Sequence, residues 1–353
     1  MTRSPAARSW LAIPAALPAA LLALFILAPA GSAQGLKIAA GHVGIGIGPV
    51  PELTGLRINF RDDNRLRRVT GINATFWAPY DDIHGDVYGL ALGLPLTGAR
   101  HMTGVGLGAG LAIHGHFNGI GLGVIGMGAG GEMTGLMIGG LGAGAGGDLT
   151  GAALGGLGVG AGGRIRGVAF SGLGVGAGGG IEGLVASLGG VGAGGQLRGV
   201  AFGGLGVGAG GGIEGIVASL GGVGAGGDVT GVAIAGLGVG AGGHLRYVSI
   251  AGLGVGAPEI TGFAAALGVG GMDITGLVLA PAYFRIEDDE GRNPGSMRGV
   301  VLSAYGDVRG SMNGLQIGLI NIADELHGLQ LGLINIARNN NRFPVLPILN
   351  YHR

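Results

Sequence analysis

The sequence predicts an all-β fold, a repeat β-solenoid of about 18 rungs of 14–16 residues each. Eighteen units between Leu53 and Leu326 begin with an apolar residue, then usually a polar one, then glycine, with Tyr247 the one exception at the third position. From Phe117 to Leu245 the spacing is 16 residues throughout. Each unit holds two short apolar runs of period two, which is strand geometry, separated by glycine-rich corners.

The first segment, residues 1–33, is predicted to be a secretory signal peptide. Arg3 and Arg8 supply a positive start, residues 10–27 are apolar, and residues 31–33 are small, as at a cleavage site. The alternative is an uncleaved membrane anchor formed by the same apolar run. The chain has no cysteine, so disulfides and a lipoprotein anchor are excluded.

Residues 34–101 are interpreted as irregular N-terminal repeats and a cap. The segment 57–86 is rich in charged and aromatic residues and includes Trp77 and Pro79. We expect its aromatic residues to close the open end of the core. Its charges and proline would prevent edge-to-edge pairing with another chain.

Residues 102–282 form the regular glycine-rich body. In the unit 181–196, numbered from Ile181 as position 1, the apolar residues at positions 4, 6, 8 or 9, 11 and 13 are predicted to point inward. The two runs then differ in parity, which indicates a bend between them, and glycine there would permit unusual backbone angles. Gly, Ala and Ser would face outward, Ser219 among them. The residues expected to stack in the core include Leu205, Val207, Val223, Leu237 and Val239.

Two other architectures compete for this body. Glycine fills six to eight of the 16 positions in each regular unit, which disfavours a helix. An antiparallel transmembrane β-barrel with one strand per unit is the alternative fold, although its aromatic girdles and unequal loops are missing. Arg166, Glu182, Arg198 and Glu214 share position 2. They would form one ladder of alternating charge in a parallel stack, although a tandem duplication of residues 164–195 also explains the alternation.

Residues 283–353 are interpreted as an acidic insertion, the last repeats and a C-terminal cap. The insertion, residues 283–295, is expected to project as a loop. Pro344 and Pro347 near the end are expected to stop further strand pairing.

No catalytic, cofactor-binding or metal site is predicted, and no cofactor is implied. The Gly-x-Gly-x-x-Gly run at 158–163 lacks the helix that dinucleotide binding requires. Calcium-binding repeats have a different spacing from the corners at Asp148 and Asp228. Two further groups are considered, the histidines as a metal site and the carboxylates as a glycosidase pair, and both are interpreted as surface residues. They are His101, His114 and His116, and Asp81, Asp82, Glu287, Asp288, Asp289 and Glu290.

The last units read N-G-L-Q-I-G-L-I-N-I-A-D-E-L at 313–326 and H-G-L-Q-L-G-L-I-N-I-A-R at 327–338, followed by L-P-I-L-N-Y. This pattern resembles a bacterial surface-repeat family of exported envelope proteins with GLQxGLxN-type repeats. The glycine-rich middle resembles the same unit, with glycine in place of polar residues such as Asn321 and Asn335. The resemblance implies a cell-envelope or surface location and no known reaction.

Composition bounds the function. Twenty basic and twenty acidic residues give a formal net charge of zero, which does not suit a nucleic-acid partner. We expect an exported, non-enzymatic structural or binding protein of the cell envelope, outer membrane or cell surface. Its partner would be an unidentified envelope or surface component, with membrane association and oligomeric state left open. The alternative function, which follows from the alternative fold, is an outer-membrane β-barrel channel.

Overall fold

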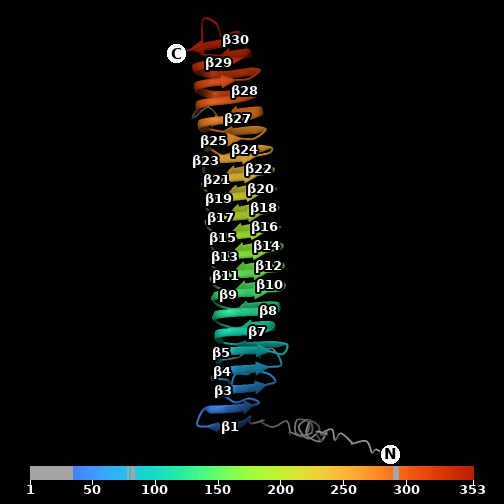
Figure 1. Cartoon of the computed structure of the whole chain (residues 1–353). Helices are drawn as coiled ribbons and strands as arrows, with labels where there is room; N and C mark the ends of the chain where they lie inside the picture. The colour runs from blue at the N-terminus through green and yellow to red at the C-terminus, as the bar shows by residue number, and fades with distance from the viewer. Residues whose placement is uncertain (1–34, 78, 81–83, 289–293) are drawn as a thin grey trace, which may run out of the picture.

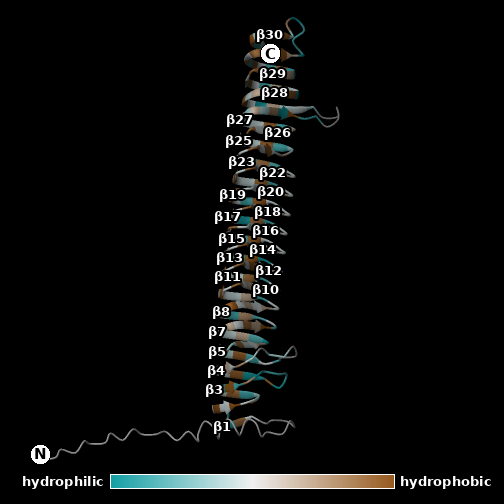
Figure 2. Ribbon diagram, turned by 90° about the vertical axis from the view of Figure 1, so that its right-hand side faces the viewer, coloured by the Kyte–Doolittle hydropathy of each residue, from teal (hydrophilic) through white to brown (hydrophobic). Residues whose placement is uncertain are grey.

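The computed structural model describes residues 35–77, 79–80, 84–288 and 294–353. Within these ranges the chain is all-β, with 30 strands wound into a β-solenoid of about 17 turns. Figure 1 and Figure 2, seen at right angles, show one narrow column with its first strand, Leu36–Ala40, at one end and its last, Val345–His352, at the other. The predicted signal peptide lies outside the described residues. The described residues contain no helix with the length and hydropathy that a bilayer crossing would require.

Each regular rung contributes one long and one short strand. The long strands are β9 (Met133–Gly139), β11 (Leu149–Gly155), β13 (Ile165–Ser171), β15 (Ile181–Ser187), β17 (Leu197–Gly203), β19 (Ile213–Ser219), β21 (Val229–Ala235), β23 (His244–Ala251) and β25 (Glu259–Ala265). The short strands are β10 (Gly142–Ala145), β12 (Gly158–Ala161), β14 (Gly174–Ala177), β16 (Gly190–Ala193), β18 (Gly206–Ala209), β20 (Gly222–Ala225), β22 (Gly238–Ala241), β24 (Gly254–Gly256) and β26 (Gly268–Gly271).

Strands of successive rungs pair in parallel, displaced by one repeat. In the long-strand sheet Arg166 lies beside Glu182 and Glu182 beside Arg198, and in the short-strand sheet Val191 lies beside Val207. The predicted solenoid and its charge ladder are therefore confirmed. The alternative of antiparallel strands closing into a barrel is wrong, and the channel function that it implied loses its basis.

Inward side chains occupy positions 1, 5, 7, 11 and 13 of the regular rungs. In the rung 181–196 these are Ile181, Val185, Ser187, Val191 and Ala193, all buried. The predicted core residues Val207, Val223 and Val239 are confirmed as buried.

Three assignments made from the sequence are wrong. Leu205 is 78% exposed and Leu237 57%, whereas Ser219 is only 5% exposed and its Oγ accepts a 3.0 Å hydrogen bond from the Gly221 N–H at the next corner. For Ser219 the reason is parity. Alternation within the long strand puts positions 1, 5 and 7 inside, so the larger apolar residues at positions 4 and 6 point outward. Leu205 and Leu237 lie in the corner between the two strands, where the alternation does not apply, and their side chains are exposed there.

The unusual backbone angles lie within the long strand and not at the corners, contrary to expectation. Gly183 has a φ of 133°, and a Cβ on it would lie 2.0 Å from the carbonyl oxygen of Gly167 in the preceding rung. The same geometry recurs at the third position of the regular rungs, so glycine is required there. Tyr247, which replaces it once, keeps a positive φ of 84° and is 66% exposed.

The N-terminal end begins with an antiparallel hairpin, whose second strand pairs in parallel with the next rung. Phe76 and Trp77 are exposed and do not close the core, contrary to expectation. Polar groups lie inside instead. The strands here are β1 (Leu36–Ala40), β2 (Val43–Ile47), β3 (Glu52–Asn59), β4 (Arg68–Thr75), β5 (Asp86–Gly93), β6 (Leu96–Ala99), β7 (His101–Ile113) and β8 (Phe117–Ala129).

The buried polar group of this end is built around Arg57 and Asp62, which form an ion pair and are each 1% exposed. Arg57 also donates to Asn73 Oδ1 at 2.9 Å, and Asn59 donates to Asp62 Oδ1 at 2.9 Å. Arg57 and Asn73 occupy position 5 of their rungs, where most rungs of the regular body have Ala or Val. The aliphatic core therefore ends here in a hydrogen-bonded polar plug.

The C-terminal strands are β27 (Asp273–Ile286), β28 (Gly295–Ile317), β29 (Ile320–Ala337) and β30 (Val345–His352). The expected loop is shorter than predicted, because residues 283–286 belong to β27 and pair with β26 and β28. Strand pairing also continues past Pro344 for one strand, since β30, which contains Pro347, pairs antiparallel to β29.

Amide side chains replace aliphatic ones in the core of this end. Gln330 donates to Gln316 Oε1 at 3.0 Å, and Asn321 donates to Asn335 Oδ1 at 2.7 Å, all four side chains being fully buried. The column that contains Asn321 continues through Gly306 and Phe284 to the core valines of the short strands. The core position that holds asparagine at this end therefore holds valine in the middle of the body. Glycine is expected there from the sequence, and that expectation is wrong.

Candidate functional site

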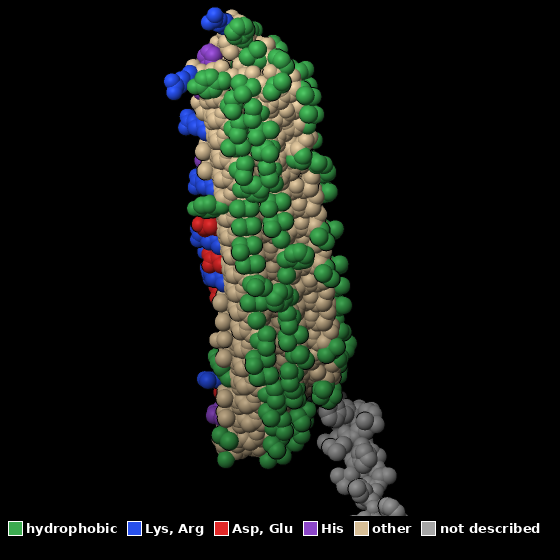
Figure 3. All heavy atoms as spheres, turned by 45° about the horizontal axis from the view of Figure 1, so that its top comes forward, with side chains coloured by type: hydrophobic (Ala, Val, Ile, Leu, Met, Phe, Trp, Pro, Cys, Tyr) green, Lys and Arg blue, Asp and Glu red, His purple; other side chains and the backbone are tan. Residues whose placement is uncertain are grey.

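The outer surface of the body has two faces of different character. The long-strand face carries the side chains at positions 2, 4 and 6 of β9 to β25. The short-strand face carries positions 10 and 12, counted from the start of each rung. Both positions are glycine in the seven rungs from 133 to 244. Figure 3 shows charged side chains along one edge and hydrophobic side chains in rows that run along the column.

The apolar rows of the long-strand face are the largest exposed feature. Position 4 contributes Val168, Leu184, Val200 and Ile216, which are 36–52% exposed. Position 6 alternates Phe170, Ala186, Phe202 and Ala218, with each phenylalanine 39% exposed. At the adjoining corner stand Leu173, Leu188, Leu205 and Leu220, which are 66–78% exposed. Continuous apolar strips of this size on a protein surface mark contact with another surface.

The charge column at position 2 runs beside these rows. Arg198 Nε lies 2.9 Å from Glu214 Oε2, and Arg166 Nε lies 3.7 Å from Glu182 Oε2. Arg166 also reaches Asp148 Oδ2 at 3.1 Å. All of these side chains are partly exposed, so each pair contributes on the order of 0.2–1 kcal/mol to stability.

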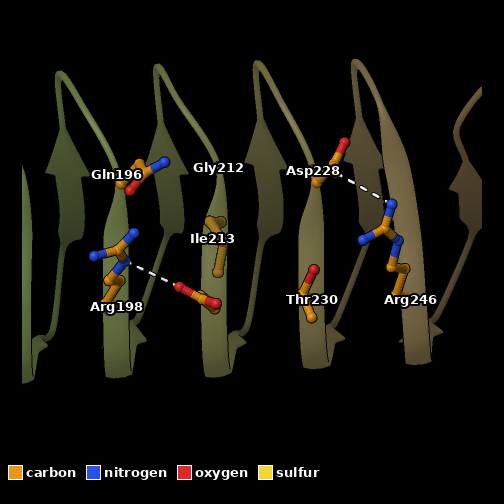
Figure 4. A pocket seen from close by; sticks show the side chains of 8 residues that line it. Gln196, Arg198, Gly212, Ile213, Asp228, Thr230 and Arg246 are labelled. Carbon is orange, nitrogen blue, oxygen red and sulfur yellow. Dashed lines mark ion pairs between the residues drawn. The ribbon is translucent and has the colours of Figure 1, made fainter.

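A shallow groove runs along the charge column from β17 to β23, between position 2 and the adjoining corner (Figure 4). It forms because Gly212 has no side chain between Gln196 and Asp228 at the same corner. Arg198 is paired with Glu214, and Arg246 Nη2 lies 3.7 Å from Asp228 Oδ2, so two cations and two anions face the groove. Because the charges compensate one another, the groove offers no net charge to a ligand.

Two of the three candidate histidines are brought together. The rings of His101 and His116 stack with centroids 5.2 Å apart, and the backbone N–H of His116 donates to His101 Nδ1 at 3.1 Å. Asp148 and Asp228 act similarly at their corners, where their carboxylates accept the backbone N–H of Arg164 at 2.8 Å and that of His244 at 3.0 Å. These side chains therefore cap backbone donors of the next rung. No group of three metal-ligating side chains occurs among the described residues.

The remaining candidates are also in structural positions. The Gly-x-Gly-x-x-Gly run at 158–163 covers β12 and the corner after it, and leads into the strand β13. Glu287 Oε1 lies 3.7 Å from Arg285 Nε, and Asp288 Oδ1 lies 4.0 Å from Arg309 Nη1. Asp81, Asp82, Asp289 and Glu290 lie outside the described residues.

Two local side-chain interactions shift pKa values. Burial opposes ionisation of Asp63, but hydrogen bonds from the Arg65 side chain and backbone outweigh it and lower the pKa of that carboxyl below its usual value. A hydrogen bond to the Tyr283 side chain raises the pKa of Arg285. Both pairs lie near the ends of the column, away from the regular body.

Comparison of the chain with family models, with curated proteins and with solved structures gives no match. The fold is therefore characterised by its own geometry. The feature that sequence reasoning missed is the outward direction of the apolar rows. The signal that could have shown this direction is position 1 of the unit, which is apolar in every unit. If position 1 points inward, alternation along the long strand puts positions 5 and 7 inside and positions 4 and 6 outside.

Proposed function

We propose that this protein is an exported, non-enzymatic structural protein of the cell envelope or cell surface, a stiff rod that engages its surroundings along its sides. The observation that carries the proposal is the single uninterrupted column with apolar rows along its length. About 17 turns at the ~4.8 Å strand spacing make a rod on the order of 80 Å long.

The stiffness of the rod supports a structural role. Each rung is hydrogen-bonded to the next along both sheets, and one aliphatic core runs from Leu66 to Ala337. Bending the column would break ladder hydrogen bonds and open this core at the same time. Repeat stacks of this kind present extended lateral surfaces, which is how they bind.

Export is supported by residues 1–33, whose charge, apolar run and small residues are those of a signal peptide. An envelope or surface location is supported by the resemblance of the units at 313–338 to exported surface repeats. The absence of cysteine is consistent with a rod that gains its rigidity from backbone ladders and packing.

The proposal is tested by fractionating cells that express the full chain and sequencing the N-terminus of the recovered protein. We expect the chain in the envelope or surface fraction with a start at Gln34. A matched variant that lacks residues 2–33 should remain in the cytoplasm with the same circular dichroism spectrum. A full chain that stays in the cytoplasm and keeps Met1 would contradict the proposal.

A further inference from the structure

The long-strand face has a two-rung pattern in the four rungs that start at Ile165, Ile181, Leu197 and Ile213. Position 2 reads Arg166, Glu182, Arg198, Glu214, and position 6 reads Phe, Ala, Phe, Ala in the same order. Charge and side-chain size therefore alternate together along the column. Buried position 5 alternates in the same rungs, with Ala169, Val185, Ala201 and Val217, as expected of a two-rung duplication. The charges and rings of positions 2 and 6 lie on the outside, where they are available to a partner.

Two copies of this face, with their strands aligned, can meet about a two-fold axis in only two ways. An axis parallel to the column would reverse the strands and lay the charge column of one copy over the corner leucines of the other, which would desolvate charges without partners. An axis parallel to the strands keeps each column of side chains on its equivalent and reverses the order of the rungs. Only the second arrangement matches charge with charge and apolar rows with apolar rows.

When the order of the rungs is reversed, each basic residue of the alternating ladder in one copy lies opposite an acidic residue in the other. With the axis midway between β15 and β17, Glu182 faces Arg198 of the second copy, and Arg166 faces Glu214 of the second copy. We propose that the long-strand face binds a second copy of this chain in this antiparallel arrangement. This inference goes beyond the envelope role and holds for the purified protein wherever the cell places it.

Side-chain size is complementary about the same axis. Phe170 faces Ala218 of the second copy and Phe202 faces Ala186 of the second copy, so each exposed ring meets a small residue. Facing sheets pack ~10 Å apart, a spacing that a ring opposite a methyl group fills and two opposed rings would exceed. Charge and size occupy separate columns of the same two-rung repeat, and both fit the same axis in the four central rungs. In the outer rungs position 6 sets Leu154 opposite Ile234 of the second copy and Ile138 opposite Ile250 of the second copy.

The area is sufficient for a stable dimer. Eight rungs, from Met133 to Ala251, lie symmetrically about the axis, four on each side. At ~4.8 Å per rung and ~3.3 Å per residue of a seven-residue strand they cover ~900 Å² per copy. A specific interface needs ~800 Å² per partner. At position 2 of the outer four rungs, Thr150 faces Thr230 of the second copy and Thr134 faces Arg246 of the second copy. Like charges therefore never face each other across these eight rungs.

The test measures the dissociation constant of the purified protein by sedimentation equilibrium, together with its melting temperature. Glu182→Arg should weaken the dimer about tenfold, since it places like charges opposite each other twice per dimer. Adding Arg198→Glu should restore the dimer, because the two exchanged side chains again have opposite charges across the interface. Within each chain the double variant sets like charges side by side, so its melting temperature should not recover.

A second pair of variants tests size in the same assay. Ala186→Phe should weaken the dimer, because it opposes two rings, and adding Phe202→Ala should restore it. A protein that remains monomeric at high micromolar concentration overturns the proposal. A dimer that none of these variants weakens, or double variants that fail to recover, would also overturn it, as would a monomer that floats with phosphatidylcholine vesicles through the same rows.

Discussion

The two outer faces of the column cover the same core but differ completely in what they show to solvent. Beneath both faces, small and medium aliphatic side chains such as Val185 and Val191 fill the interior. Outside, the long-strand face of the regular body keeps leucine, isoleucine and phenylalanine, whereas its short-strand face has only glycine at the outward positions from Gly142 to Gly240. At Gly192 a Cβ would meet no atom within 4 Å, so the fold does not require glycine there.

This contrast separates what the fold demands from what it permits. Inward positions and the third position of each rung are constrained by packing and by the neighbouring backbone. Outward positions are free, so the large apolar residues kept on one face and the bare backbone kept on the other require a reason outside the monomer. The long-strand face is accordingly where we place the interface.

The largest expected effect comes from placing charge on the two sides of one short strand. Val223→Asp buries a carboxylate in the core and should reduce the free energy of unfolding by several kcal/mol. Gly224→Asp, one residue on, points its side chain into open space and should change stability little. Chemical denaturation of both variants checks this. Equal losses would refute the inward and outward assignments of β20.

A smaller effect distinguishes two glycines of one rung. Gly183→Ala forces a Cβ toward the Gly167 carbonyl at a φ of 133° and should cost at least ~1–3 kcal/mol. Gly192→Ala has room and should be neutral or stabilise by ~0.4–1 kcal/mol through the unfolded state. Urea midpoints at constant slope measure both. If Gly192→Ala is as damaging as Gly183→Ala, the short-strand face is not free.

The smallest effect is a gain of stability at Tyr247. This side chain holds a positive φ of 84° at a position that is glycine in the other units. Tyr247→Gly should raise the free energy of unfolding by ~1 kcal/mol, because it relieves that strain. Arg246→Gly, at the neighbouring extended position, is the control and should lower it. A loss of stability in Tyr247→Gly would show that the exposed ring makes contacts which outweigh the strain.

Much of the fold could be predicted from the sequence, because a strict period of 16 residues leaves few architectures. The rungs, the parallel register and the charge ladder from Arg166 to Glu214 follow from that period and are confirmed. The direction of the long strand does not follow from it. Apolar residues occur on both sides of that strand, so the sequence pattern places Leu184 and Phe202 in the core, whereas Ile181 and Val185 form it.

The ends were predicted least well. Burial of Arg57 beside Asp62 and Asn73 depends on contacts across rungs and on the residues after β3, which a one-dimensional pattern does not contain. The antiparallel strand β30 likewise follows from the open edge of β29 and not from any repeat. The apolar rows on the long-strand face become visible only once the parity of the strands is known.

The most direct test of the whole account is a disulfide on the bare face. Gly192→Cys and Gly208→Cys place two thiols on paired residues of β16 and β18, in a chain without other cysteines, on the face away from the proposed interface. Parallel rungs ~4.8 Å apart allow an intramolecular disulfide on mild oxidation. Gly192→Cys with Gly224→Cys, two rungs apart and ~10 Å away, should not form one. Efficient crosslinking of the first pair alone supports the parallel stack, and failure of that pair would contradict it.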